Sequence, residues 1–187
     1  MKVTVQEPWL DLHGYLQDPE NHQVEMIGNP KLMSDGIVFS GTDGLLIHQE
    51  LFPGIERFTV SIRFNPSSLG PWQQRFFHIQ DLHSQDRFLM ELRMEPDGTW
   101  YADTFFQSGD HHCILQDPDI RFPADQWYDY VVSYDGSTLR HTINGKGLIE
   151  ATFPDARLPR ASGCALGIRW NKVYPFVGII QSVKVAY

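Results

Sequence analysis

Hydrophobic side chains recur at every second position in several short stretches of the chain, a spacing that predicts β-strands with one buried face. Residues 58–64 read Phe-Thr-Val-Ser-Ile-Arg-Phe, and residues 88–94 alternate in the same way. No comparable stretch has the period of an amphipathic helix. Further strands are predicted at 36–40, 44–48, 74–80, 100–105, 127–134, 139–143, 165–170 and 178–185.

Turn signals separate these runs. Asp135-Gly136 and Asn144-Gly145 lie between alternating segments, and Pro96-Asp97-Gly98 precedes another, as expected for β-hairpins. Residues 107–125 lose the pattern and are predicted to form a long polar loop. The fold class predicted is therefore all-β, a two-sheet antiparallel β-sandwich that occupies residues 1–187 as one domain.

Composition and charge narrow the function classes. The chain has 187 residues, 42% of them hydrophobic, which is enough for a core in one domain. Its 15 Lys and Arg residues against 23 Asp and Glu give a net charge of -8, which disfavours nucleic acid and anionic membranes as partners. Residues 1–7 lack the apolar core of a signal peptide, and no apolar run long enough to span a membrane occurs. A soluble chain is expected, with compartment and oligomeric state left open.

Four segments together resemble the laminin-G-like and pentraxin-like branch of the concanavalin A-like lectin/glucanase superfamily. They are Asp35–Phe39 followed by 58–64, Trp127–Gly136, Ile143–Lys146, and Phe176–Ile180 followed by Val183–Val185. The resemblance implies a jelly roll of two bent antiparallel sheets with one concave and one convex side. Members of the superfamily bind glycans, proteins or lipids, and some cleave polysaccharides, so the resemblance leaves the function open.

The residues that alternate with the predicted core suggest a glycan-binding face, expected on the concave side of the jelly roll. Polar side chains two apart on one strand and on adjacent strands come into contact range, so they can form a continuous groove. A sugar fits such a surface, since its hydroxyls need fixed donors and acceptors and its C–H face packs on an aromatic ring such as Tyr101 or Trp72. The alternative is an ordinary solvated sheet face. The candidate glycan-binding residues are Arg63, His78, Gln80, Glu91, Arg93, Tyr101, Asp103 and Asp129.

The same groove could hold a polysaccharide-active enzyme. Glu91 with Asp103 or Asp129 could form a hydrolytic carboxylate pair, but the Glu-x-Asp-x-x-Glu strand of laminarinase-like relatives does not occur. Glu91-Leu92-Arg93 is similar to a strand of jelly-roll alginate lyases, whose Gln-Ile-His strand appears here reversed at residues 78–80. That similarity implies His78, Glu91, Arg93 and Tyr101 as catalytic candidates of a lyase. A protein-interaction module is a third hypothesis.

Metal binding has weaker support. Loop carboxylates at Asp110, Asp117, Asp119 and Asp125 suit calcium, which relatives often bind on rim loops, but such residues also cap turns. Asp110-His111-His112-Cys113 is a poor zinc site, because consecutive residues of an extended segment point to opposite sides and a second ligand pair is missing. No cofactor is required by the predicted function.

The cysteines and tryptophans allow further predictions. Cys113 and Cys164 either pair across the sandwich or remain buried free thiols. Trp9, Trp127 and Trp170 are predicted to anchor the core, and Trp72, in a polar loop, to be exposed. Residues 162–164, Ser-Gly-Cys, are predicted to form a turn.

Overall fold

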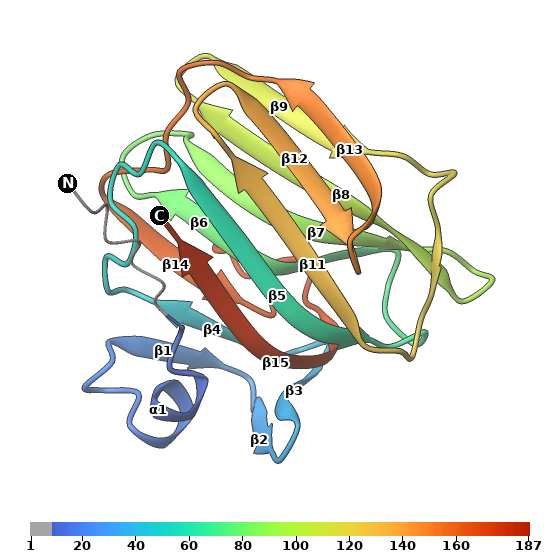
Figure 1. Ribbon diagram of the computed structural model, residues 1–187. Helices are drawn as coiled ribbons and strands as arrows, with labels where there is room; N and C mark the ends of the chain where they lie inside the picture. The colour runs from blue at the N-terminus through green and yellow to red at the C-terminus, as the bar shows by residue number, and fades with distance from the viewer. Residues whose placement is uncertain (1–8) are drawn as a thin grey trace.

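Two antiparallel sheets packed face to face make up almost the whole of the computed structural model, which describes residues 9–187 (Figure 1). The segment 1–7, considered above for a signal peptide, lies outside the described residues. The elements are α1 (Leu12–Gln17), β1 (Val24–Ile27), β2 (Lys31–Met33), β3 (Gly36–Ser40), β4 (Gly44–Ile47), β5 (Phe58–Pro66), β6 (Gln73–Asp81), β7 (Arg87–Met94), β8 (Thr99–Ser108), β9 (His111–Gln116), β10 (Phe122–Pro123), β11 (Tyr128–Tyr134), β12 (Thr138–Ile143), β13 (Lys146–Thr152), β14 (Ser162–Leu166) and β15 (Val177–Ala186).

Each sheet combines strands that follow one another in sequence, such as β6-β7-β8 or β11-β12-β13, with strands from distant parts of the chain. The eight-stranded sheet has the order β1-β4-β14-β6-β7-β8-β10, with β9 also paired to β8. The seven-stranded sheet has the order β13-β12-β11-β5-β15-β3-β2. All pairs are antiparallel, as in the register of β7 with β8 and of β5 with β11. The predicted fold class, an antiparallel β-sandwich, is confirmed.

The core is a layer of aromatic side chains between the sheets. Phe64 of β5 stacks on Phe76 of β6 with ring centroids 4.8 Å apart, and Trp100 of β8 meets Phe64 edge-on at 5.4 Å. These contacts join strands of opposite sheets, and all three side chains are fully buried. Aromatic pairs of this kind each add about 0.5–1.5 kcal/mol beyond area burial. They fix which face of each strand points inward.

The predicted polar loop at 107–125 is wrong for most of its length. Strand β8 continues to Ser108, β9 pairs with it from His111 to Gln116, and β10 follows. Only Cys113 and Leu115 of β9 are buried, while the other four positions are exposed. Two inward apolar residues in a strand rich in His and Gln were too weak a signal for an edge-strand prediction.

Other local predictions also fail. Residues 162–164 lie in β14 rather than in a turn, and α1 had no counterpart in the predicted elements. Trp9 is 61% exposed and Trp127 is half-buried outside the core clusters, so the prediction that they anchor the core is wrong; Trp100 has that position. Trp170 is half-buried and packs against a small second cluster of Leu46, Ala165 and Ile168, as predicted in part. Trp72 is exposed as predicted.

Both cysteines are free and buried. Cys113 on β9 and Cys164 on β14 belong to the same eight-stranded sheet, which rules out a disulfide across the sandwich in this structure. Within residues 9–187, no helix has both the length and the apolar character needed to cross a membrane.

Candidate ligand-binding site

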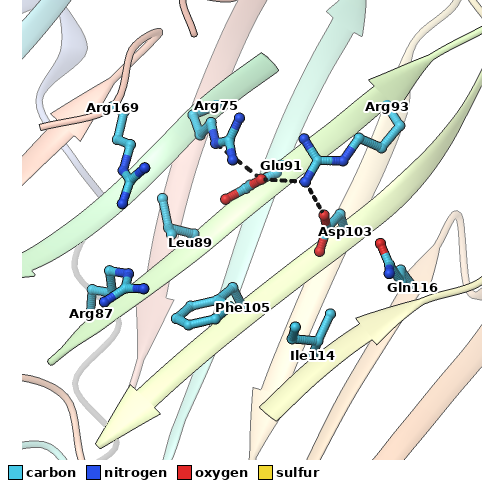
Figure 2. Close-up of a pocket in the computed structure, with 10 residues that line it drawn as sticks. All are labelled: Arg75, Arg87, Leu89, Glu91, Arg93, Asp103, Phe105, Ile114, Gln116 and Arg169. Carbon is cyan, nitrogen blue, oxygen red and sulfur yellow. Dashed lines mark hydrogen bonds and ion pairs between the residues drawn. The ribbon is translucent and has the colours of Figure 1, made fainter. Parts of the chain in front are cut away.

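A pocket of about 230 Å³ opens on the outer face of the eight-stranded sheet (Figure 2). Its floor comes from β6, β7, β8 and β9, and one residue comes from the turn after β14. The lining side chains are Arg75, Arg87, Leu89, Glu91, Arg93, Asp103, Phe105, Ile114, Gln116 and Arg169.

Strand alternation directs these side chains outward. On β7, Phe88, Met90 and Leu92 enter the core, so the intervening residues face the pocket. Glu91 lies opposite Asp103 in the antiparallel register of β7 and β8. On β6 a register shift between residues 75 and 77 lets both Phe76 and Phe77 reach the core while Arg75 faces outward.

A buried ion-pair network forms the centre of the pocket. Nη2 of Arg93 contacts Oδ2 of Asp103 at 2.6 Å and Oε2 of Glu91 at 3.2 Å. Nε of Arg75 contacts the same Glu91 oxygen at 3.0 Å. The side chains of Glu91 and Asp103 are only 3% and 6% exposed, and Nη1 of Arg93 is buried without a hydrogen-bond partner. The network therefore holds two guanidinium groups in place and leaves one buried nitrogen of Arg93 without a partner.

Burial dominates the electrostatics of the two acids. It raises the pKa of Glu91, against the attraction of Arg75, and it raises the pKa of Asp103, against the attraction of Arg93. Removing a charged carboxylate from water is expensive unless it is paired and hydrogen-bonded. The acids are thus suited to positioning the two arginines, both of which line the pocket.

Two exposed aromatic rings flank this network. Trp72 lies 5.2 Å from the guanidinium carbon of Arg93, and Tyr174 lies 4.1 Å from that of Arg75. The rings are 53% and 42% exposed. Their backbones are held by strand residues, since Met94 N–H donates to Trp72 O and Arg75 N–H donates to Tyr174 O. Apolar rings beside fixed hydrogen-bond donors make an amphipathic binding surface.

A family model of the laminin-G type, described as the concanavalin A-like lectin/glucanases superfamily, matches residues 39–187. The chain belongs to this superfamily. No curated protein sequence matches the chain.

Solved structures agree with this superfamily fold. A pentraxin from Limulus polyphemus has a TM-score of 0.63 at 17% identity, with 79% of this chain and 73% of that chain covered. Domain 4 of an extracellular arabinanase from Geobacillus stearothermophilus, in complex with arabinotriose, has a TM-score of 0.56 at 19% identity, covering 87% and 81%. A sialidase carbohydrate-binding module from Ruminococcus gnavus, bound to α2,3-sialyllactose, has a TM-score of 0.54 at 20% identity, covering 71% and 76%.

Three of the predicted residues of this concanavalin A-like protein come together in the pocket. Glu91, Arg93 and Asp103 line it. Tyr101 lies opposite Arg93 in the register of β7 with β8 but is nearly buried and does not line the pocket. Gln80 instead stabilises the turn between β6 and β7, because its Nε2 donates to the carbonyl oxygens of Asp81 and Ser84.

His78 is covered rather than accessible. It is 1% exposed, and its Nδ1 accepts a hydrogen bond from the Trp170 backbone N–H at 2.9 Å. Burial, with smaller contributions from Arg169 and Arg87, lowers its pKa to about 3. The expectation that His78 shares the ligand-binding groove is wrong, because the turn after β14 folds over it. A lyase mechanism with His78 as its base is disfavoured for the same reason.

The prediction that Arg63 and Asp129 share the groove is wrong. Both lie on the seven-stranded sheet, where they form an exposed ion pair at 3.1 Å beside the Trp127 ring. Strand parity identifies the outward face of a strand, but it does not say which of the two sheets the strand joins.

The candidate calcium ligands do not converge. Asp110 and Asp117 lie at opposite ends of β9, and Asp117 Oδ1 accepts from the Asp119 backbone N–H in a turn. Asp125 Oδ1 accepts from the Ser68 backbone N–H. Residues 9–187 contain no group of three His, Cys, Asp or Glu side chains that could hold a metal ion.

Three pocket arginines were missed by the sequence analysis. Arg87 has the parity of Glu91 and lies one residue before the predicted strand, so a longer strand would have included it. Arg75 is turned outward by the register shift in β6, and Arg169 follows β14 in a turn. No pattern in the sequence indicates either position.

Proposed function

We propose that the protein binds a carbohydrate in the pocket on the outer face of its eight-stranded sheet. The observation that carries this proposal is the exposed Trp72 ring beside Arg93, whose guanidinium is fixed by two buried carboxylates and keeps an unpaired Nη1. A sugar ring offers an apolar C–H face to such an aromatic side chain and hydroxyl oxygens to such a donor.

The comparisons support this class of ligand. Two neighbours with the same fold are, by their descriptions, bound to arabinotriose and to sialyllactose. Their identity to this chain is low, so the argument rests on the pocket itself and uses the neighbours only as precedent for the fold.

Trp72→Ala tests the proposal. We expect the variant to lose about tenfold in affinity for the glycan selected from an array, since an aromatic contact is worth about 0.5–1.5 kcal/mol beyond its area. Trp9→Ala is the matched control, because Trp9 is also exposed but lies beside Lys184 of the seven-stranded sheet. Calorimetric titration of both variants with the selected glycan gives the comparison.

The array is run with and without a chelator. We propose that glycan binding is independent of calcium, because the pocket donors are guanidinium groups and an amide. If no glycan binds, or if both tryptophan variants bind as the parent protein does, carbohydrate recognition in this pocket is excluded. Loss of binding on chelation would contradict calcium independence alone.

A further inference from the structure

The pocket has an excess of positive charge although the protein is acidic. Four arginines and two carboxylates line it, whereas the whole chain carries a net charge of -8. Glu91 and Asp103 pair with Arg75 and Arg93. The other two arginines, Arg87 and Arg169, form no ion pair with an acidic side chain among residues 9–187, and the attraction of Glu91 for Arg87 is weaker than the effects of burial and Arg169.

Arg87 and Arg169 lie together at one end of the pocket. Figure 2 shows them on either side of Leu89, away from the Glu91–Arg93–Asp103 network. Arg87 lies over the Phe105 ring at 4.5 Å, and its Nη1 donates to Gln85 O and to Gln107 Oε1. Its Nε is buried without a partner. The Arg169 side chain has no hydrogen bond or ion pair within the described part of the chain.

The two guanidinium groups repel each other. Burial lowers the pKa of Arg87, and the neighbouring Arg169 lowers it further. Arg169 acts in the same direction on Arg75, after burial and Arg93. Like charges held close together in a partly buried site are destabilising unless an opposite charge joins them. This end of the pocket is therefore complementary to an anion.

We infer that the bound sugar carries an oxyanion group, a carboxylate or a sulfate ester, which binds between Arg87 and Arg169. This inference rests on the proposed function. Guanidinium groups bind planar or tetrahedral oxyanions through charge-assisted N–H donors, while the opposite end of the pocket offers Gln116, Asp103 and Arg93 to uncharged hydroxyls. The pocket is thus expected to bind an acidic group of the sugar at one end and uncharged hydroxyl groups at the other.

The protein's overall charge restricts the ligand further. Ionic screening confines exposed charge interactions to about 8 Å at physiological salt, so the local arginines act on a group inside the pocket. A densely charged polyanion would also extend beyond these arginines along a protein whose net charge is -8. An oligosaccharide with isolated acidic groups fits both conditions.

Arg169→Gln tests the inference with Arg63→Gln as its matched control. Both variants remove one arginine charge, but Arg63 lies on the opposite sheet. The Arg169 side chain makes no hydrogen bond or ion pair within the described residues, so its variant is expected to fold normally. The three proteins are compared on an array of neutral, uronate-containing, sialylated and sulfated glycans, and the best acidic binder is titrated by calorimetry.

We expect binding to be confined to acidic glycans, with Arg169→Gln weakening it about 10- to 100-fold and Arg63→Gln leaving it unchanged. The uronate, sialic acid and sulfate arms then distinguish the source of the oxyanion. Neutral glycans bound as well as acidic ones, or an unaffected Arg169→Gln, would overturn this inference while leaving carbohydrate binding intact. Absence of binding to every glycan would remove the proposed function itself.

Discussion

Arg93 organises the polar floor of the pocket through a single nitrogen. Its Nη2 contacts both Asp103 and Glu91, and its guanidinium lies beside the Trp72 ring. Arg75 shares Glu91, whereas Asp103 has no second ion-pair partner among the described residues. The geometry at the pocket centre therefore depends on Arg93, Glu91 and Asp103. The sequence predicted all three on the strand faces that point away from the core.

Arg93→Met is expected to lower the free energy of unfolding by about 3–5 kcal/mol, because it leaves the buried Asp103 carboxylate without its ion-pair partner and Glu91 with Arg75 alone. Urea denaturation measures the change. Arg140→Met is the control, since Arg140 pairs with Asp135 and Glu150 on the surface, where ion pairs contribute about 0–1 kcal/mol. Equal effects of the two substitutions would show that the Arg93 network does not stabilise the fold.

The sequence identified individual side chains of the site better than it identified the complete set. Period-two alternation placed Glu91, Arg93 and Asp103 on outward faces, and the structure brings them together. The same rule gave Arg63 and Asp129 an outward face on the wrong sheet. Parity is a local property of a strand, whereas sheet membership depends on long-range pairing that single-strand patterns do not contain.

At the level of elements, β14 and the turn after it determine what the pocket can contact. Trp170 packs its ring over Gly163 of β14, where an added Cβ would lie 2.1 Å from the ring. Its backbone N–H bonds to His78, and the adjacent Arg169 lines the pocket. Because residue 163 has no side chain, the Trp170 ring can pack there. This packing positions the Trp170 backbone over His78 and the Arg169 side chain that is proposed to bind the anion.

Gly163→Ala is expected to cost about 1–3 kcal/mol of unfolding free energy, because the methyl group displaces the Trp170 ring. Urea denaturation followed by tryptophan fluorescence measures it. In a Trp170→Ala background the same substitution should cost little, since the obstructing ring is gone, and the double-mutant cycle isolates the contact. Equal costs in both backgrounds would contradict the packing explanation.

Element boundaries show where sequence patterns fail. The register shift in β6 turns Arg75 outward and sends two consecutive phenylalanines inward, which breaks the period that predicts strands. Strand β9 was missed because only two of its residues are buried. Long alternating strands such as β5 and β7 were predicted well, because each buries apolar residues at every second position.

On the scale of the whole molecule, buried neutral histidines couple stability to pH. Burial lowers the pKa of His141 to about 4, and its Nδ1 is 2.8 Å from Thr104 Oγ1. His78 has a pKa of about 3. In the unfolded chain a histidine takes up a proton near pH 6.5, so as the pH falls below this value the unfolded state binds more protons than the folded state. The fold loses stability over that range.

His78→Asn is expected to reduce the pH dependence of the unfolding free energy by about 1.4 kcal/mol per pH unit between about pH 6 and pH 4. The Asn Oδ1 can accept the Trp170 N–H in place of Nδ1, which limits the loss of structure. Urea denaturation across this pH range gives the slopes, with His111→Asn, at an exposed position of β9, as control. An unchanged slope would show that His78 is protonated in the folded protein.

The two aromatic rings at the pocket edge belong to loops far apart in the chain, one before β6 and one before β15. Each loop is attached to the floor by a backbone hydrogen bond, while the charged residues of the floor lie mainly on paired strands. Exchanging the loop before β6 would therefore alter the shape presented to a ligand without disturbing the electrostatic floor, whereas the loop before β15 also carries Arg169. The loop before β6 is thus the one at which selectivity and scaffold are separable, which makes it suited to grafting and directed evolution.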